Sequence, residues 1–80
     1  MYTVYVLESL KDHSRYVGST SVDIKQRLEW HNLGSNRSTK NKRPLKLVYF
    51  EEFEDKTIAL SREKFFKSGD GRRVLSSKVG

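Results

Sequence analysis

Three runs of β-prone residues stand out along the chain, and each predicts a strand. Residues 2–7 alternate apolar and β-prone side chains, and residues 15–18 form a shorter run of the same kind after a polar stretch. Two such runs in close succession are typical of an antiparallel hairpin, here with its turn near Leu10 and Lys11. We therefore expect these two strands to pair with each other.

The third run, residues 45–53, carries apolar side chains on both of its faces. At a period of two, one face takes Leu45, Leu47 and Tyr49, and the other takes Val48 and Phe50. A strand that is apolar on both faces is typical of the middle of a sheet. We therefore expect this third strand to be the central one.

Helix signals lie between the second and third strands. Thr20 and Ser21 are N-cap candidates, and Thr20 with Asp23 fits a capping box. A helix is predicted to follow and to run to about Leu33, where Gly34 ends it.

Two more helices are predicted after the third strand. Asp55 is placed to cap a helix that runs to about Ser68 and is ended by Gly69, and Asp70 is placed to cap a short terminal helix. The element order is then β-β-α-β-α-α, within one domain over residues 1–80. This order predicts an α+β fold with a small, mainly antiparallel three-stranded sheet flanked by helices.

Charge favours an anionic partner. Sixteen Lys and Arg residues against ten Asp and Glu residues give a formal net charge of +6. Residues 35–44 form a polar loop that we expect to be exposed and mobile. Five cationic side chains are candidates for contacts to the backbone phosphates of a nucleic acid, with a solvated charged surface as the alternative. These five are Lys40, Lys42, Arg43, Arg72 and Arg73.

Composition excludes several classes of site. The chain has no cysteine, which excludes disulfides and thiolate ligands, and two isolated histidines do not form a conventional zinc cluster. A hard cation bound by oxygen ligands remains open. The sequence shows neither an apolar run of transmembrane length nor a signal-peptide pattern, so we expect a cytoplasmic protein without a membrane partner.

Two polar residues interrupt the apolar stripe of the first predicted helix. Arg27 and His31 share this stripe with Ile24 and Leu28, at helical spacing. Burying an arginine without a partner is costly, so Arg27 should pair with a carboxylate or bind an anion, unless its head reaches water. His31 is a candidate to accept a proton, position a water molecule or donate to a phosphate group. Its alternative role is to bind the last carbonyls of the helix.

The residues beside His31 and in the second predicted helix have structural interpretations too. Trp30 and Leu33 are expected in the core rather than as groups that stack on nucleobases. Arg62 is expected to pack its stem on the sheet or to pair with a carboxylate. The acidic residues over 51–55 are expected to form a solvated surface.

Two tyrosines and one glutamate complete the candidate site. Tyr5 and Tyr16 lie in the two hairpin strands and can face each other across the ladder, although tyrosine is common in strands for structural reasons alone. Glu63, at the margin of the apolar arc of its helix, is the candidate metal ligand. The alternative for Glu63 is an exposed ion pair with Lys67 at i, i+4. Gly18 indicates a place where another group approaches the backbone closely.

The order and spacing of these motifs resemble the GIY-YIG endonuclease family, and most closely its small single-domain bacterial members. The motifs are Thr3-Val4-Tyr5, Tyr16-Val17-Gly18, Arg27, His31 and Arg62-Glu63-Lys64. The resemblance implies a DNA endonuclease in which Tyr16 takes the proton of the attacking water while Tyr5 and His31 position the reacting groups. It also implies that Arg27 stabilises phosphate charge and that Glu63 holds one Mg²⁺ or Mn²⁺ ion.

The chain also departs from the family pattern. Thr3-Val4 replaces the Gly-Ile of the first motif, Val17 replaces the Ile of the second, and no asparagine follows Asn41. Many family members carry an asparagine after the glutamate. This departure leaves open a non-catalytic nucleic-acid-binding module, or a subunit that needs a protein partner for target recognition. With no separate recognition domain in view, we expect recognition of DNA structure rather than of a long sequence.

Overall fold

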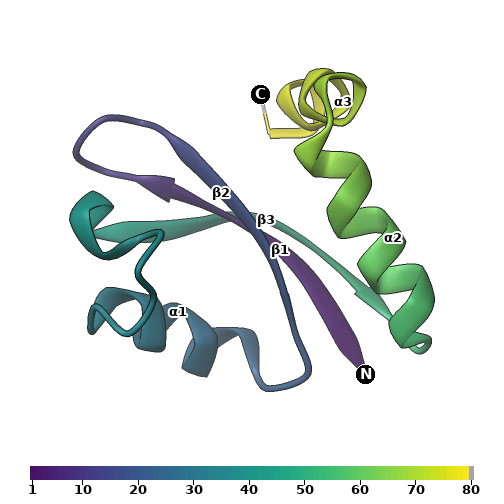
Figure 1. Cartoon of the computed structure of the whole chain (residues 1–80), viewed down its shortest axis with the longest axis horizontal. Coiled ribbons are helices and arrows are strands. Elements are labelled where there is room, and N and C mark those ends of the chain that lie inside the picture. Colours follow the sequence, from purple (N-terminus) through teal and green to yellow (C-terminus); the bar gives the residue numbers. More distant parts are fainter. Residues whose placement is uncertain (80) are drawn as a thin grey trace.

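The computed structural model of the protein describes residues 1–79. It consists of a three-stranded sheet with helices on both faces (Figure 1). The elements are β1 (Tyr2–Ser9), β2 (Arg15–Thr20), α1 (Ile24–Asn32), the 3₁₀ helix η1 (Lys40–Lys42), β3 (Leu45–Phe53), α2 (Lys56–Lys67) and α3 (Gly69–Val79). The predicted α+β class, the antiparallel sheet and the order β-β-α-β-α-α are confirmed. No helix within residues 1–79 is long and apolar enough to cross a bilayer.

The central strand is β1, so the prediction that residues 45–53 form the central strand is wrong. The strand order is β2-β1-β3, with both pairings antiparallel. A register shift between Val6 and Leu7 of β1 explains the misleading pattern, because Val6 pairs with Tyr49 whereas Leu7 pairs with Leu47. Val48 is the extra residue of this irregularity, and it moves Tyr49 to the opposite face from Leu47.

Side chains that alternate along β1 build two separate clusters. Val4 and Val6 pack with residues of α2 and α3, including the fully buried Phe66. Tyr5 and Leu7 point to the opposite face and pack with residues of α1 and β3. The sheet therefore separates α1 from the α2–α3 pair, as Figure 1 shows.

The first helix begins one residue after Asp23, so the predicted caps at Thr20 and Ser21 are wrong. The Asp23 carboxylate accepts a hydrogen bond from the backbone N–H of Lys25 at 2.7 Å. Thr20 instead belongs to the end of β2, where its hydroxyl accepts from the Val22 N–H. The predicted stop is confirmed, since the helix ends before Gly34 and that residue has a φ of 82°.

The connection between the last two helices is shorter than the sequence predicts, because α2 ends at Lys67 and α3 begins at Gly69. Asp55 caps α2 as expected, accepting from the N–H groups of Thr57 and Ile58. Asp70, however, lies inside the first turn of α3, which already begins at Gly69. The Ser68 hydroxyl oxygen accepts from the Gly71 N–H at 3.1 Å, so Ser68 takes the capping role expected of Asp70.

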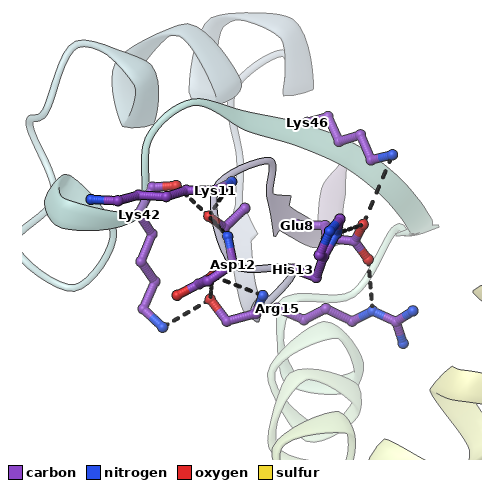
Figure 2. Close-up of polar contacts among 9 residues, drawn as sticks. Glu8, Lys11, Asp12, His13, Arg15, Lys42 and Lys46 are labelled. Atoms are coloured by element: carbon purple, nitrogen blue, oxygen red, sulfur yellow. Dashed lines mark hydrogen bonds and ion pairs between the residues drawn. The ribbon is translucent and has the colours of Figure 1, made fainter.

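The loop over residues 35–44 is attached to the sheet, which corrects the prediction that it is exposed throughout. Thr39 is fully buried, and the Ser9 hydroxyl donates to the Lys42 carbonyl at 2.7 Å. Figure 2 shows Lys42 reaching the hairpin tip, where its ammonium group donates to the Ser14 hydroxyl at 2.9 Å. Glu8 anchors the other side of the tip through Arg15 (Figure 2). The loop therefore contributes to the interior of the molecule.

Candidate active site

The two tyrosines share one face of the sheet but do not pair directly. Tyr5 lies opposite Gly18 and Tyr16 lies opposite Leu7, so the tyrosines are diagonal neighbours with ring centroids 6.5 Å apart. The expected direct pairing fails because the turn is centred one residue later than predicted. A Cβ atom at Gly18 would lie 2.6 Å from the Tyr5 hydroxyl oxygen. Gly18 therefore admits the Tyr5 side chain, which is the close approach that the sequence indicates.

A buried hydrogen-bonded chain runs from Tyr5 through His31 to Thr39. The Tyr5 hydroxyl lies 2.8 Å from Nε2 of His31, and the Thr39 hydroxyl lies 2.8 Å from Nδ1 of the same ring. His31 and Thr39 have no exposed surface, and Tyr5 retains 3%. The side chain of His31 thus reaches a tyrosine of the central strand and does not cap its own helix.

The neighbours of His31 are more exposed than expected. Trp30 is 36% exposed and Leu33 is 71% exposed, so the prediction that both lie in the core is wrong. Trp30 stands at the edge of His31, with ring centroids 4.9 Å apart. The residues of α1 that pack on the sheet are Ile24, Leu28 and His31, and Asn32 adds two hydrogen bonds to the backbone of Leu45.

Arg27 does not form an ion pair with a carboxylate in the described part of the chain, residues 1–79. Its Nε atom donates to the Thr20 hydroxyl at 3.2 Å, and its guanidinium carbon lies 4.6 Å from the centre of the Trp30 ring. The side chain is half-buried. Its remaining N–H donors make Arg27 a group that can bind an anion from solution.

Glu63 lies on α2 and contacts both the sheet and a lysine. One carboxylate oxygen accepts from the Ser19 hydroxyl at 2.6 Å, and the other accepts from the Lys67 ammonium at 2.8 Å. The expected pair with Lys67 therefore exists, although the Glu63 side chain is only 19% exposed. A carboxylate held by a strand residue has a defined place at the edge of the sheet, because Ser19 belongs to the edge strand β2.

Electrostatics connect the charged groups to Tyr5. Burial raises the pKa of Tyr5 most strongly, and Tyr16 raises it further. The positive charge of Arg27 lowers this pKa, whereas the negative charge of Glu63 raises it. Both charges therefore act on the Tyr5 hydroxyl, although Arg27 and Glu63 come from different helices.

The acidic residues near the end of β3 do not add to this site. Glu51 forms a bidentate pair with Arg62, with N–O distances of 2.8 and 3.2 Å. The hydrogen bond from Arg62 holds the pKa of Glu51 below its ordinary value. The predicted structural role of Arg62 agrees with this pairing, whereas the expected fully solvated surface is wrong for Glu51.

The candidate site offers a divalent cation one protein carboxylate, that of Glu63. Within residues 1–79, no group of three or more His, Cys, Asp or Glu side chains gathers to hold a metal ion. Mg²⁺ commonly binds proteins through one or two carboxylates, with water and substrate phosphates as further ligands. Glu63 meets this requirement, since its contact with the exposed Lys67 is a weak surface pair that a stronger ligand can replace.

The basic candidates occupy different surroundings. Lys42 is held by the hairpin, Arg43 donates to the Lys40 carbonyl at 2.8 Å, and Lys40 is exposed. Arg72 lines a surface hollow that also includes Tyr16, whereas Arg73 is 83% exposed and lies 3.7 Å from Asp70. The same hollow includes Arg15 and Lys67. The structure therefore places Arg72 in a hollow that reaches Tyr16 of the edge strand β2 and leaves Arg73 out of its lining.

Comparison with known proteins decides the family. A family model described as the GIY-YIG catalytic domain matches residues 1–73. The chain belongs to the GIY-YIG family. UPF0213 protein CPE1444 of Clostridium perfringens is 44% identical over 98% of this chain and 86% of that relative. UPF0213 protein SpyM3_1077 of Streptococcus pyogenes serotype M3 is 39% identical over 95% of this chain and 78% of that relative. No solved structure matches the chain.

Membership of the GIY-YIG family confirms the resemblance read from the motifs and supports a nuclease. Two residues of the candidate site escaped the sequence reasoning. Thr39 lies in a polar loop without periodicity, and its burial depends on a contact with a helix eight residues earlier. No local pattern around Ser19 indicates its partner, because Glu63 is 44 residues away.

Acidification is expected to destabilise this fold through His31. Burial lowers the pKa of His31, and the positive charge of Arg27 lowers it further. Between the ordinary value of about 6.5 and that lower value, the unfolded chain binds a proton that the folded chain does not. The free energy of unfolding should therefore decrease as the pH is lowered through this window, by at most about 1.4 kcal/mol per pH unit. Urea denaturation between about pH 7 and about pH 5 measures this slope.

Two variants separate His31 from the other histidine. His31→Gln should flatten the pH slope, whatever its effect on overall stability. His13→Asn should keep the slope, because the His13 side chain is 81% exposed, and asparagine tolerates the positive φ at that position. An equal slope in wild type and His31→Gln would contradict the assignment.

Proposed function

We propose that the protein is a metal-dependent DNA endonuclease that hydrolyses phosphodiester bonds. The observation that supports this proposal is that Tyr5 and Tyr16 pack with ring centroids 6.5 Å apart and that the charges of Arg27 and Glu63 both act on the pKa of Tyr5, in a chain of the GIY-YIG family. Arg27 supplies a cation without an ion-pair partner in residues 1–79, and Glu63 supplies a carboxylate that is held in place. Together these groups can bind a phosphate and the charge that develops during its hydrolysis.

The two phenols have different surroundings, which supports different roles for them. Tyr5 is buried and hydrogen-bonded to His31, so it is suited to position a reacting group. Tyr16 is half-buried, and the hydrogen bond of its hydroxyl within residues 1–79 is a long one of 3.5 Å from the Asn36 amide. In our proposal Tyr16 therefore accepts the proton of the attacking water, and Arg27 stabilises the phosphate.

Glu63 is the residue that would hold the metal ion, Mg²⁺ or Mn²⁺. A bound divalent ion supplies charge stabilisation and makes a coordinated water more acidic. Ser19 fixes one oxygen of Glu63 through its hydroxyl, so the carboxylate keeps its orientation toward the sheet edge. The tyrosines and Arg27 remain responsible for placing the water and the phosphate.

Contacts to phosphates give affinity without reading sequence, so we propose selectivity for DNA structure. The test incubates the protein with labelled linear, nicked, flapped and four-way-junction DNA, in Mg²⁺, in Mn²⁺ or in EDTA. We expect metal-dependent cleavage of at least one branched or nicked substrate and none in EDTA. Equal cleavage in EDTA would contradict the metal requirement, and faster cleavage of linear DNA would contradict the selectivity.

The absence of an asparagine after Asn41 favours a second candidate, a binding module without turnover. That candidate predicts salt-sensitive DNA affinity with no metal-dependent products. Cleavage that appears only after a partner protein is added would instead identify a partner-dependent subunit. The DNA panel above distinguishes these outcomes when binding is measured beside cleavage.

Arg72 is expected to contact DNA more strongly than Arg73. Arg72 lines the hollow beside Tyr16, whereas Arg73 lies on the same helix outside that hollow. Arg72→Ala should weaken DNA binding several-fold and reduce the slope of log affinity against log salt by about 1. Arg73→Ala, the matched control, should leave the slope unchanged. Equal effects in both variants would favour general charge attraction over a contact in the hollow.

A further inference from the structure

We infer that Thr39 is a positioning residue: its hydroxyl donates to Nδ1 of His31, so that Nε2 carries the ring proton and donates to Tyr5. The Tyr5 hydroxyl is then free to donate its own proton to a phosphate oxygen of bound DNA. The inference rests on the proposed nuclease function. Neither the sequence motifs nor the family match assigns a role to Thr39.

Counting protons shows that the two hydrogen bonds among Tyr5, His31 and Thr39 leave one hydroxyl proton over. The neutral His31 ring, the Thr39 hydroxyl and the Tyr5 hydroxyl each carry one proton, whereas two hydrogen bonds join them. In residues 1–79, Thr39 makes its side-chain hydrogen bond to His31. The position of the ring proton therefore decides which hydroxyl proton is left over.

The two tautomers leave that proton in different places. If Nδ1 carries the ring proton, Thr39 must accept it, and the Thr39 hydroxyl proton is left over. Thr39 has no exposed surface, so this proton would be a buried donor without an acceptor. If Nε2 carries the ring proton, the leftover proton belongs to Tyr5. Tyr5 retains 3% exposure, and its hydroxyl lies next to Gly18 of the edge strand β2.

The second arrangement pairs the donors of Thr39 and His31 and leaves over the proton of Tyr5, the one member of the three with any exposed surface. The Nε2–H group also donates to the Tyr5 oxygen. This polarises the phenol, so its O–H becomes a stronger hydrogen-bond donor. Thr39 thus acts on Tyr5 through His31, without any contact to the substrate.

The ring proton can be located directly by NMR. The measurement uses ¹⁵N-labelled protein carrying His13→Asn, so that one of the two histidines remains and its ring signals need no assignment. Long-range ¹H–¹⁵N correlation should show Nε2 protonated and Nδ1 unprotonated near neutral pH. A ring protonated at Nδ1 would overturn the inference. This measurement is made with Thr39 unchanged.

Two variants of Thr39 then test the donor itself. Thr39→Val keeps the shape but removes the hydroxyl, so the two tautomers should mix and DNA cleavage should fall about 10- to 100-fold. Thr39→Ser keeps the donor and should restore both the Nε2–H pattern and most of the activity. A Thr39→Val protein with the wild-type ring pattern and wild-type cleavage would overturn the inference.

The ring measurement also separates this inference from the proposed function. If wild type cleaves no DNA but shows Nε2–H, and Thr39→Val disturbs that pattern, the nuclease proposal fails and the role of Thr39 in placing the proton is supported. If wild type cleaves DNA with Nδ1 protonated, the nuclease proposal stands and the inference about Thr39 fails.

Discussion

Glu63→Gln is expected to abolish metal-dependent cleavage while leaving the fold and DNA binding intact. Glutamine keeps the length of the side chain and an oxygen that can accept from Ser19 Oγ, which contacts Glu63 at 2.6 Å. It removes the negative charge that a divalent ion requires. A metal contributes several kcal/mol to stabilising the charge of the transition state, so the rate should fall at least about a hundredfold.

The measurement compares initial cleavage rates at saturating Mg²⁺, with binding followed separately by fluorescence anisotropy. Glu54→Gln is the matched control, because Glu54 is an exposed carboxylate outside the candidate site. It loses the same charge and should keep the wild-type rate. Cleavage by Glu63→Gln at the wild-type rate would exclude Glu63 as the metal ligand.

Tyr16→Phe should reduce cleavage by about 10²- to 10⁴-fold, the range typical of removing a general base. The change deletes only the hydroxyl, whose single contact in residues 1–79 is the long one to Asn36. The ring should keep its packing beside Tyr5 and His31, with centroids 6.5 and 5.2 Å away. Stability and DNA affinity should therefore change little, and the loss should appear in the single-turnover rate.

Two other tyrosine variants serve as comparisons for Tyr16→Phe. Tyr2→Phe makes the same chemical change on the opposite face of the sheet, where Tyr2 packs in the α2–α3 cluster, and should leave cleavage unchanged. Tyr5→Phe should also slow cleavage, since it removes the hydroxyl that His31 orients. If Tyr5→Phe proved inactive while Tyr16→Phe cleaved normally, the roles of the two tyrosines would be exchanged.

Local signals were sufficient to predict the elements of the GIY-YIG fold. Strand periodicity located β1 and β3, and Asp55 and Gly34 marked helix ends correctly, because caps and turns depend on a few neighbouring residues. The structural role of Arg62 also followed from its place on an apolar arc. These features are encoded within single elements or between adjacent ones.

Features that depend on contacts between distant segments could not be predicted from local sequence patterns. The order β2-β1-β3 depends on which strand pairs with two others, and apolar side chains on both faces of residues 45–53 misled because Val48 is an extra residue in the ladder. The diagonal placement of Tyr5 and Tyr16 depends on the hairpin turn, where a shift of one residue moves the pairing by two.

The sequence by itself therefore determined the family, the elements and the reactive residue types of this protein. Tertiary structure alone decided that Thr39 is buried against His31 and that Ser19 holds Glu63. It also decided that burial raises the pKa of Tyr5. The physical reason is that hydrogen bonds and desolvation depend on which groups meet in space, and these groups lie 8 to 44 residues apart along the chain.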